Sequence, residues 1–600
     1  MLYQNVKKLL KRYFENFVFF YQRLGRRIII RVLLSIAVSL FDGLGLSMFL
    51  PLLQMVEKSG SYHSENLGNL RFLVDGLAYL GIGINLLSVL IVLCSFFILK
   101  GLVQYASSTY EVKIRQYFVK TTRRRLTLLM GEMSYKNFVL SDVGKVQNTL
   151  SGEVSRLSMA FQQYFATVQQ GVMVLVYIGF AFFVDVKFAL IICLGGGLTN
   201  LLYKRIYAYT QAASRKLVFG TNYYQGLILQ YVNSFKYLKA TGLLKDYNGK
   251  LLGTIDHIEE TNSKIGKYSA IVSGTREPLL IIVVSTVILI QVNVLGGSLG
   301  TILISLLFFY RALSSLMLMQ SSYNGFLGVY GSIENMTEFE KELSNSREKQ
   351  GTYELKEFKN QIVLEKAGLR YKDREILRNI SLTIEKDRTI AFVGESGSGK
   401  TTLVNVLAGL IPLDEGKLLI DGIRSSELNM VSYQKNIGYI TQDPVIFSDT
   451  IFNNVTFWAD PTPENYSRFH LALKKASLED FVGNLPEKEL TELGNNGINL
   501  SGGQRQRISI ARELFKDVDI LILDEATSAL DSETEKSIQE NIESLHGKYT
   551  VLIVAHRLST IKDADSIVVM SKGEIVESGS FDKLMKTSKK FGKMIELQEL

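Results

Sequence analysis

The sequence predicts a two-part fold: an all-α six-helix transmembrane domain followed by an α/β domain. Residues 28 to about 320 contain repeated apolar stretches of the length that crosses a bilayer. The part after about residue 340 has charges throughout and the pattern of a water-exposed α/β chain. A chain of 600 residues is also too long for one globular core, so two domains are expected.

The composition argues against nucleic-acid binding and against a site built from cysteines. The formal net charge of +9 is concentrated around the apolar stretches, where cytoplasmic loops attract Lys and Arg, so we interpret it as topology. Nucleic acid is therefore not expected as a partner. The two cysteines, Cys94 and Cys193, lie inside apolar segments, and neither a disulfide framework nor a thiol metal site is supported.

The domain boundaries follow from shifts in composition. Residues 1–27 combine basic and aromatic side chains without a small-residue cleavage site, which predicts an amphipathic helix on the cytoplasmic membrane surface. A disordered basic tail is the alternative. We expect the transmembrane domain at 28–333, a charged linker at 334–352 and the α/β domain at 353–600.

Six spans fit the hydropathy pattern. They are expected at 28–56, 86–108, 161–184, 187–208, 271–293 and 296–320. The long polar stretches after the second and fourth spans are rich in Lys and Arg, which places them and both termini in the cytosol. Each stretch is expected to extend its flanking helices as a hairpin that reaches the α/β domain.

Between the first two spans, leucines recur every three or four residues from Leu67 to Leu80. This apolar face is too short to span a membrane and predicts an external helix at the interface, with a small extracellular cap as the alternative.

Ionisable residues fall within or beside spans: Asp42, Lys100, Arg276 with Glu277, and Arg311. Charges at membrane depth are costly and usually face a polar cavity or a partner. They predict a cavity that attracts an anionic head group such as a phosphate. An internal ion pair, between Asp42 and Lys100 or Arg311, is the alternative.

The α/β domain contains a phosphate-binding loop between an apolar strand and a helix. Its glycines let backbone amides approach phosphate oxygens, Lys400 is expected to reach the β- and γ-phosphates, and Thr401 to bind Mg²⁺. The loop residues expected to bind nucleotide are Gly394, Glu395, Ser396, Gly397, Ser398, Gly399, Lys400, Thr401 and Thr402. The second domain is therefore predicted to be an α/β P-loop ATPase domain.

A second apolar run, residues 520–523, ends in two carboxylates. Asp524 is placed to hold Mg²⁺ through water, and Glu525 to polarise the attacking water.

Between these motifs lies Ser501-Gly502-Gly503-Gln504, followed by a basic, helix-forming segment. This resembles the signature loop of the ATP-binding-cassette (ABC) family, and the resemblance extends over the whole C-terminal domain. In that family the loop completes the nucleotide site of the opposite subunit, so a single chain would not close its own site.

The resemblance implies further roles. Tyr371 corresponds to the aromatic residue that stacks on adenine, Gln442 to the glutamine that senses Mg²⁺, Asp531 to the loop that crosses the dimer and His556 to the switch histidine at the γ-phosphate. One departure is Asn495, where many exporters have an acid, and it leaves the details of cross-talk with the membrane helices open.

Six spans followed by one cassette are similar to ABC exporters, which implies an ATP hydrolase coupled to transport, with ATP and Mg²⁺ as cofactors. A homodimer in a bacterial inner membrane, with the ATPase domain cytoplasmic, is expected. A weaker similarity to bacterial flippases suggests a lipid-linked oligosaccharide as substrate. Flipping of lipid A or a phospholipid, export of drugs or peptides, and an ATP-gated channel or regulatory ATPase remain alternatives.

Overall fold

The computed structural model describes residues 15–49, 51–52, 79, 85–184, 186–293, 299–371, 374–524, 547–555 and 561–596. The chain divides into two compact units. The helical domain contains residues 1–133 and 140–347, and the domain predicted to be an ATPase, called the ATPase domain below, contains residues 134–139 and 348–600. The expected external helix before residue 81 lies outside the described residues, apart from position 79.

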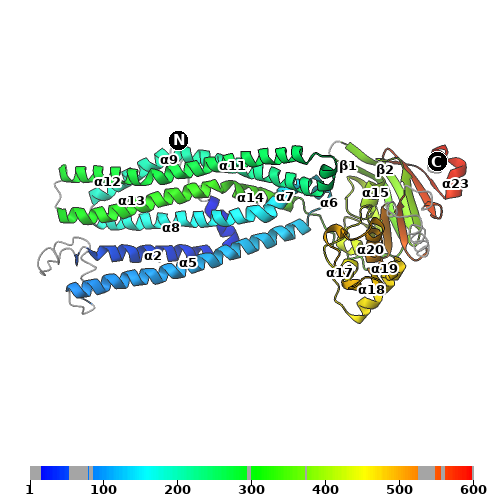
Figure 1. Cartoon of the computed structure of the whole chain (residues 1–600), viewed down its shortest axis with the longest axis horizontal. Helices are drawn as coiled ribbons and strands as arrows, with labels where there is room; N and C mark the ends of the chain where they lie inside the picture. The colour runs from blue at the N-terminus through cyan, green and yellow to red at the C-terminus, as the bar shows by residue number, and fades with distance from the viewer. Residues whose placement is uncertain are drawn as a thin grey trace. The chain divides into compact units, whose positions relative to one another are not determined.

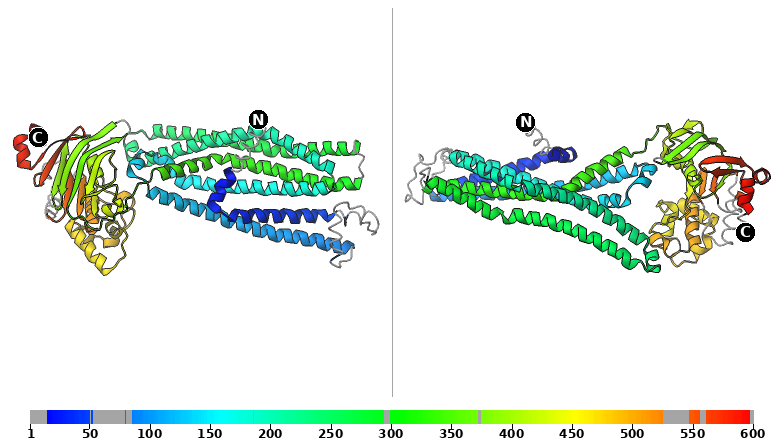
Figure 2. Two further views of the ribbon diagram at one scale, coloured as in Figure 1. Left: turned by 180° about the vertical axis from the view of Figure 1, so that it is seen from behind. Right: turned by 90° about the horizontal axis from the view of Figure 1, so that it is seen from above.

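The helical domain consists of long helices that run side by side (Figures 1 and 2). Its elements are α2 (Arg27–Ser47), α5 (Leu86–Gly131), α7 (Val143–Asn148), the π-helical turn η2 (Thr149–Glu153), α8 (Val154–Val184), α9 (Val186–Asn233), α10 (Phe235–Ala240), α11 (Leu244–Gly274), α12 (Arg276–Asn293), α13 (Leu299–Gly328) and α14 (Tyr330–Asn345). Helix α2 packs on α5, α8 on α13 and α9 on α11.

Four described segments have the length and composition to cross a membrane: Arg27–Ser47, Leu86–Gly131, Val143–Phe182 and Leu244–Thr286. The other two predicted spans lie on α9 and α13, part of whose residues fall outside the description of side chains. Helix α5 has 46 residues, so it is about 69 Å long, more than twice the thickness of a hydrocarbon core. Such a helix must continue well beyond the membrane.

An aromatic cluster holds the first helices of the domain together. Residues 15–24 are helical, and Phe20 is fully buried. Its ring centroid lies 5.7 Å from those of Phe118 on α5 and Phe161 on α8. The N-terminal helix, expected on the membrane surface, therefore packs one face into the bundle, because aromatic rings at this spacing stabilise each other beyond simple burial.

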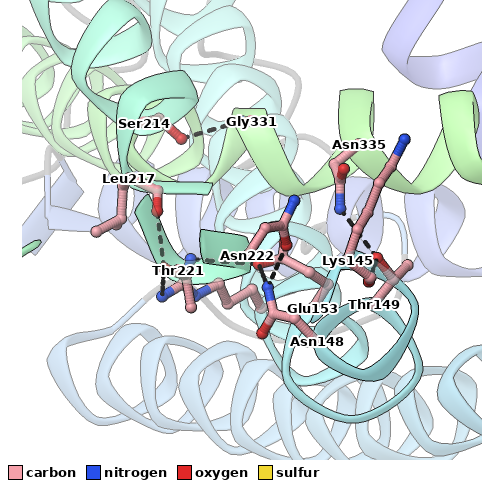
Figure 3. A network of polar contacts seen from close by, with 11 residues as sticks. Lys145, Asn148, Thr149, Glu153, Ser214, Leu217, Thr221, Asn222, Gly331 and Asn335 are labelled. Carbon is pink, nitrogen blue, oxygen red and sulfur yellow. Dashed lines mark hydrogen bonds and ion pairs between the residues drawn. The ribbon is translucent and has the colours of Figure 1, made fainter. Parts of the chain in front are cut away.

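A polar network fastens the turn between α7 and α8 to α9 (Figure 3). The side-chain amide of Asn148 donates to Asn222 Oδ1 (2.7 Å) and to Glu153 Oε1 (3.2 Å). Glu153, fully buried in η2, also accepts from Arg156 Nη1 at 3.3 Å. Asn335 on α14 joins the network by donating to Thr149 Oγ1 at 3.3 Å. Glu153 Oε2 has no hydrogen-bond partner among the described residues, but the other contacts between these polar groups favour a single packing arrangement.

The segment expected to be a linker, 334–352, differs from the expectation. Helix α14 continues to Asn345, and the domain boundary falls between residues 347 and 348. Met336, Phe339 and Leu343 are buried at helical spacing, so most of the charges that suggested a linker belong to the polar face of an amphipathic helix. Glu340, in contrast, is buried and pairs with Arg23.

The ATPase domain contains the short helix α6 (Tyr135–Leu140) and the part of the chain after residue 347. Its strands are β1 (Gln361–Tyr371), β2 (Arg374–Glu385), β3 (Thr389–Gly394), β4 (Glu415–Ile420), β5 (Ile423–Arg424), β6 (Ile437–Ile440), β7 (Ile520–Asp524), β8 (Thr550–Val554), β9 (Ser566–Ser571) and β10 (Glu574–Gly579). Its helices are α15 (Lys400–Leu407), α16 (Met430–Gln434), α17 (Ile451–Thr456), α18 (Pro463–Lys475), α19 (Glu479–Gly483), η3 (Lys488–Leu490), η4 (Asn495–Gly497), α20 (Gly502–Phe515), α23 (Phe581–Thr587) and α24 (Lys589–Glu596).

The described strands form two sheets. One has the order β2-β1-β4-β5, and the other has the order β10-β9-β3-β8-β7-β6 with a parallel centre. Both faces of the parallel sheet are covered, because Leu521 and Leu523 of β7 enter one core while Ile520 and Ile522 enter the other. Burial on both faces explains why this strand is continuously apolar in the sequence.

Candidate functional site

The phosphate-binding loop joins β3 to α15, at the centre of the parallel sheet. Three of its glycines have positive φ angles: 153° at Gly394, 78° at Gly397 and 100° at Gly399. A Cβ atom at Gly394 would lie 2.3 Å from the carbonyl oxygen of Met570. Other residues are therefore excluded at this position, and the loop keeps its backbone amides open to a ligand.

Lys400, the first residue of α15, is 6% exposed. Its ammonium donates to the carbonyl oxygens of Gly394 (2.8 Å) and Glu395 (3.2 Å) and so lies folded over the loop. Ser398 is also buried, and its hydroxyl has no hydrogen-bond partner among the described residues. A buried cation and an unpaired hydroxyl in a loop before a helix N-terminus suit the phosphates of a nucleotide.

The other predicted residues of the nucleotide site follow the carboxyl ends of neighbouring strands. In the parallel sheet, β3, β8, β7 and β6 are adjacent. Asp524 is the last residue of β7, 9% exposed, and Gln442 comes two residues after β6 and is exposed. Carboxyl ends of parallel strands meet at one edge of a sheet, the usual ligand site of this architecture. Glu525, Asp531 and His556 lie outside the described residues, although the strands that lead to Glu525 and His556 end at this edge.

Tyr439 on β6 was missed by the sequence analysis. Its hydroxyl contacts Asn405 Oδ1 on α15 at 3.0 Å and Asp524 Oδ2 at 3.5 Å. Burial, the charge of Asp524 and the neighbouring Tyr135 raise the pKa of the Tyr439 phenol. This tyrosine thus stays protonated and connects the helix after the phosphate loop to the acidic strand end. The only sequence signal was its place three residues before Gln442.

The signature loop forms the start of α20. Ser501 is the N-cap of this helix, and its hydroxyl accepts from the Gln504 amide at 3.2 Å. Gln504 Oε1 in turn accepts from the Ser501 amide at 2.8 Å. This capping box fixes the helix start while Ser501 itself remains exposed. Gly502 and Gly503 are the first two helical residues, so the positive end of the helix is open to an anion.

A buried arginine connects this signature helix to the loop after Gln442. Arg512 on α20 donates to the carbonyl oxygens of Asn454 (2.6 Å) and Val445 (2.7 Å). Burial lowers the pKa of Arg512, but these charge-assisted hydrogen bonds satisfy its guanidinium. Asn495, the departure from the exporter pattern, accepts a hydrogen bond from Ser448 at 2.7 Å in the same region.

Tyr371, predicted to stack on adenine, is the last residue of β1 and pairs with Arg374 on β2. Burial and the nearby Tyr135 of α6 raise the pKa of its phenol. Tyr371 is only partly buried, as stacking on a flat ligand would require.

The charged residues predicted to face a cavity in the spans differ in their burial and in their partners. Asp42 on α2 is 1% exposed, forms an ion pair with Lys100 on α5, and accepts a hydrogen bond from Tyr177 on α8. The internal ion pair weighed as an alternative is therefore present. Arg276 lies 3.7 Å from Glu277 at the start of α12, and Arg311 is exposed on α13.

Arg31 is a further charged residue within a predicted span, and the sequence did not single it out. It is 2% exposed on α2 and donates to Ser107 (2.9 Å) and Glu111 (2.6 Å) on α5 and to Gln169 (2.9 Å) on α8. Three helices therefore meet at one guanidinium. Its position four residues into the first span was a signal, but its partners on the other two helices are 76 or more residues away.

Comparison with known proteins identifies the ATPase domain. Residues 377–528 match the ABC transporter family. The chain is 44% identical over 245 residues to an ATP-dependent lipid A-core flippase of Syntrophus aciditrophicus, which covers 41% of this chain and 40% of that protein. It thus spans about two fifths of that relative.

Two relatives align over most of their length. An ATP-dependent lipid A-core flippase of Haemophilus influenzae is 27% identical and covers 84% of this chain and 87% of the relative. The heterocyst differentiation ATP-binding protein HepA of Nostoc is 27% identical, with 95% and 93% covered. A bacterial Atm1-family ABC exporter, solved with ATP bound, has a TM-score of 0.75 at 21% identity and covers 96% of this chain and 99% of that structure. The predicted fold class, a helical domain followed by a P-loop ATPase domain, is confirmed.

Proposed function

We propose that this chain, a half-transporter of the ABC exporter type, is an ATP-driven flippase for a phosphate-bearing glycolipid. One observation carries the ATP-driven part of the proposal: a buried lysine and a serine hydroxyl without a partner among the described residues lie in a glycine loop at the edge where β3, β7 and β6 end. The same chain contains helices of membrane-spanning length and composition. An ATPase joined to such helices can use nucleotide binding to change their arrangement.

The ATPase site requires two copies of the chain. The phosphate loop and the signature helix α20 belong to separate elements, and Ser501 is exposed at the N-terminus of its helix. We infer that Ser501, Gly502, Gly503, Gln504 and Asp531 of one copy complete the nucleotide site of a second. Because every expected nucleotide motif occurs in this sequence, a homodimer with two working sites is the simplest assembly.

Within each site, we assign the chemistry to residues of this chain. Lys400 and the loop amides hold the phosphates, and Thr401, Gln442 and Asp524 are the ligands that would hold Mg²⁺, whose oxygen preference they match. Bound Mg²⁺ would neutralise charge that develops on the phosphates. Glu525 is assigned as the residue that polarises water and His556 as the contact to the γ-phosphate.

The substrate proposal rests on the relatives and on charge. Two of the relatives described above are named lipid A-core flippases, and all are bacterial, which supports a bacterial inner membrane as the location. Arg276 and Arg311 are cations without a strong internal partner among the contacts of the described residues. They suit the phosphate groups of a lipid A-type molecule, whereas Lys100 is already neutralised by Asp42.

A lipid-linked oligosaccharide is the second candidate, because it offers the same chemistry: a pyrophosphate between a lipid and a glycan. The two candidates differ in their lipid anchors. Vesicles that contain either lipid therefore distinguish them.

The test is reconstitution of the purified protein in liposomes that contain a lipid A-core glycolipid or a polyprenyl-pyrophosphate oligosaccharide. ATP-dependent loss of the glycan from the accessible leaflet by the wild type, but not by Glu525→Gln, would support the proposal. ATP hydrolysis with neither lipid moved would refute the glycolipid substrate. Hydrolysis that persists in Glu525→Gln would refute the assignment of Glu525.

A further inference from the structure

The short helix α6 lies in the ATPase domain although its neighbours in sequence, α5 and α7, belong to the helical domain. Lys136 on α6 is 23% exposed, and its ammonium lies 3.0 and 3.2 Å from the two carboxylate oxygens of Asp414. The same ammonium lies 5.9 Å from the centroid of the Tyr371 ring. The Lys136 ammonium therefore contacts both the Asp414 carboxylate and the ring of Tyr371, which is predicted to stack on the nucleotide base.

Asp414 holds the backbone that carries this ring. Its Oδ2 atom accepts from the amide of Arg370, the residue before Tyr371, at 2.7 Å. Its own amide donates to the carbonyl oxygen of Gly368 at 3.0 Å. Asp414 thus connects the ammonium of Lys136 directly to the end of β1, at the residue before Tyr371.

The ion pair persists over the physiological pH range. Burial alone would raise the pKa of Asp414, but the Arg370 amide and the Lys136 ammonium outweigh it and hold this pKa below its ordinary value. A depressed carboxyl pKa makes the pair complete above about pH 4 and weakens it only as the pH falls further. Every measurement between pH 6 and 8 is therefore made with the pair intact.

We propose that Lys136 is a positioning residue for the nucleotide base: it fixes the Tyr371 ring and the end of β1 so that a purine can stack there. The inference rests on the proposed ATPase function and extends it. Because the contacts of Lys136 involve the ring and not the phosphate loop, its loss weakens binding of ligands that contain a base. Binding of the phosphate chain alone is unaffected.

The experiment measures binding to the full-length protein in nanodiscs at pH 7. The two ligands are ATP and inorganic tripolyphosphate, which lacks a base. The variants are Lys136→Gln and the conservative Lys136→Arg. Lys145→Gln is a matched control, because Lys145 is also 23% exposed and pairs with a carboxylate, Glu342, at 2.7 Å in the helical domain.

We expect Lys136→Gln to weaken ATP binding about three- to tenfold, the range for a partly exposed ion pair with a cation–π contact. Its tripolyphosphate affinity should stay within about twofold of wild type, with Lys136→Arg and Lys145→Gln near wild type for both ligands. The proposal is overturned if ATP affinity is unchanged, if both ligands weaken equally, or if Lys145→Gln shows the same shift. If Lys136→Gln weakens ATP binding as expected but the wild-type protein flips neither glycolipid, only the proposed function is overturned.

Discussion

The ammonium of Lys400 donates to two carbonyl oxygens of its own loop, Gly394 and Glu395. A ligand phosphate would offer an anionic acceptor to the same ammonium, so nucleotide binding would exchange two hydrogen bonds to neutral carbonyl oxygens for stronger ones to an anion. The geometry thus explains how a buried lysine is tolerated before the ligand arrives.

Lys400→Met should therefore abolish turnover. We expect ATP hydrolysis to fall by about a hundredfold or more, because the phosphates lose their only buried cation among the described loop residues. Steady-state hydrolysis by the purified protein measures this loss. Lys417→Met is the control, since Lys417 is an exposed residue of β4 with one contact to Glu365 at 3.8 Å; comparable hydrolysis by Lys400→Met and the control would contradict the assignment.

Tyr439 gives a prediction about pH. Because its pKa is raised, its hydroxyl remains protonated between pH 6 and 9 and keeps its contacts to Asn405 and Asp524. Tyr439→Phe should lower kcat about three- to tenfold through less precise placement of Asp524, without altering the shape of the pH profile. An alkaline limb that disappears in the variant would show that Tyr439 titrates in this range, contrary to its environment.

At this scale, local motifs predicted the secondary structure around the residues proposed to bind nucleotide. Lys400, Asp524 and Ser501 stand in motifs whose spacing already implies a strand, a turn and a helix, and the described structure has those elements around them. Lys136 and Arg31 were not predictable as functional. Lys136 is one of many cations in a cytoplasmic stretch, and its partner Asp414 is 278 residues away.

Among the elements, α7 and α9 approach each other closely where both have a glycine, Gly144 and Gly226. A Cβ atom at Gly144 would lie 2.6 Å from Gly226 Cα and 2.9 Å from the carbonyl oxygen of Asn222. Backbone atoms cannot rotate away as a side chain can. This approach also brings Asn222 within hydrogen-bond distance of Asn148, so the glycine and the polar network of Figure 3 depend on each other.

Gly144→Ala should consequently destabilise the helical domain, by about 1–3 kcal/mol, the usual cost of overpacking. The matched change is Gly249→Ala in α11, where nothing lies within 4 Å of the new methyl group. That change should be neutral or stabilise by up to about 1 kcal/mol, because alanine favours a helix. Thermal unfolding in detergent compares the two, and equal melting temperatures would argue against a tight contact at Gly144.

Element boundaries were predicted less well than element types. The cytoplasmic extensions of the membrane helices were expected, and α5 and α9 do run far beyond span length. The linker was misplaced because a charged amphipathic helix and a charged linker have similar composition, and only the buried apolar face of α14 distinguishes them. That face depends on packing partners that composition does not reveal.

For the whole molecule, the order of domains was predictable because hydropathy and the phosphate loop each cover long, separate parts of the chain. The substrate was not. Charge in a span predicts either a ligand or an internal partner, and the charged residues here have two different environments: Asp42 is paired with Lys100, while Arg311 is exposed. Only the three-dimensional neighbours of each residue decide between them.

The two-copy nucleotide site yields the last prediction. Lys400→Ala removes the phosphate cation, and Ser501→Arg blocks the exposed start of α20 with a bulky side chain. Each variant alone should be inactive, because every site in its homodimer contains the defect. In a mixed dimer, one site combines both defects, whereas the other takes Lys400 from one copy and Ser501 from the other and is intact.

Co-expression of the two variants in equal amounts should therefore restore ATP hydrolysis to about a quarter of wild type, since half of the dimers are mixed and each has one intact site. This value holds if each site turns over independently, and strict coupling of the two sites would lower it. Tandem purification of mixed dimers that carry two different tags measures the activity per dimer directly. If each chain instead closed its own site, the one defect of each chain would inactivate its own site. No mixture would then contain an intact site, and hydrolysis would stay at the level of the separate variants.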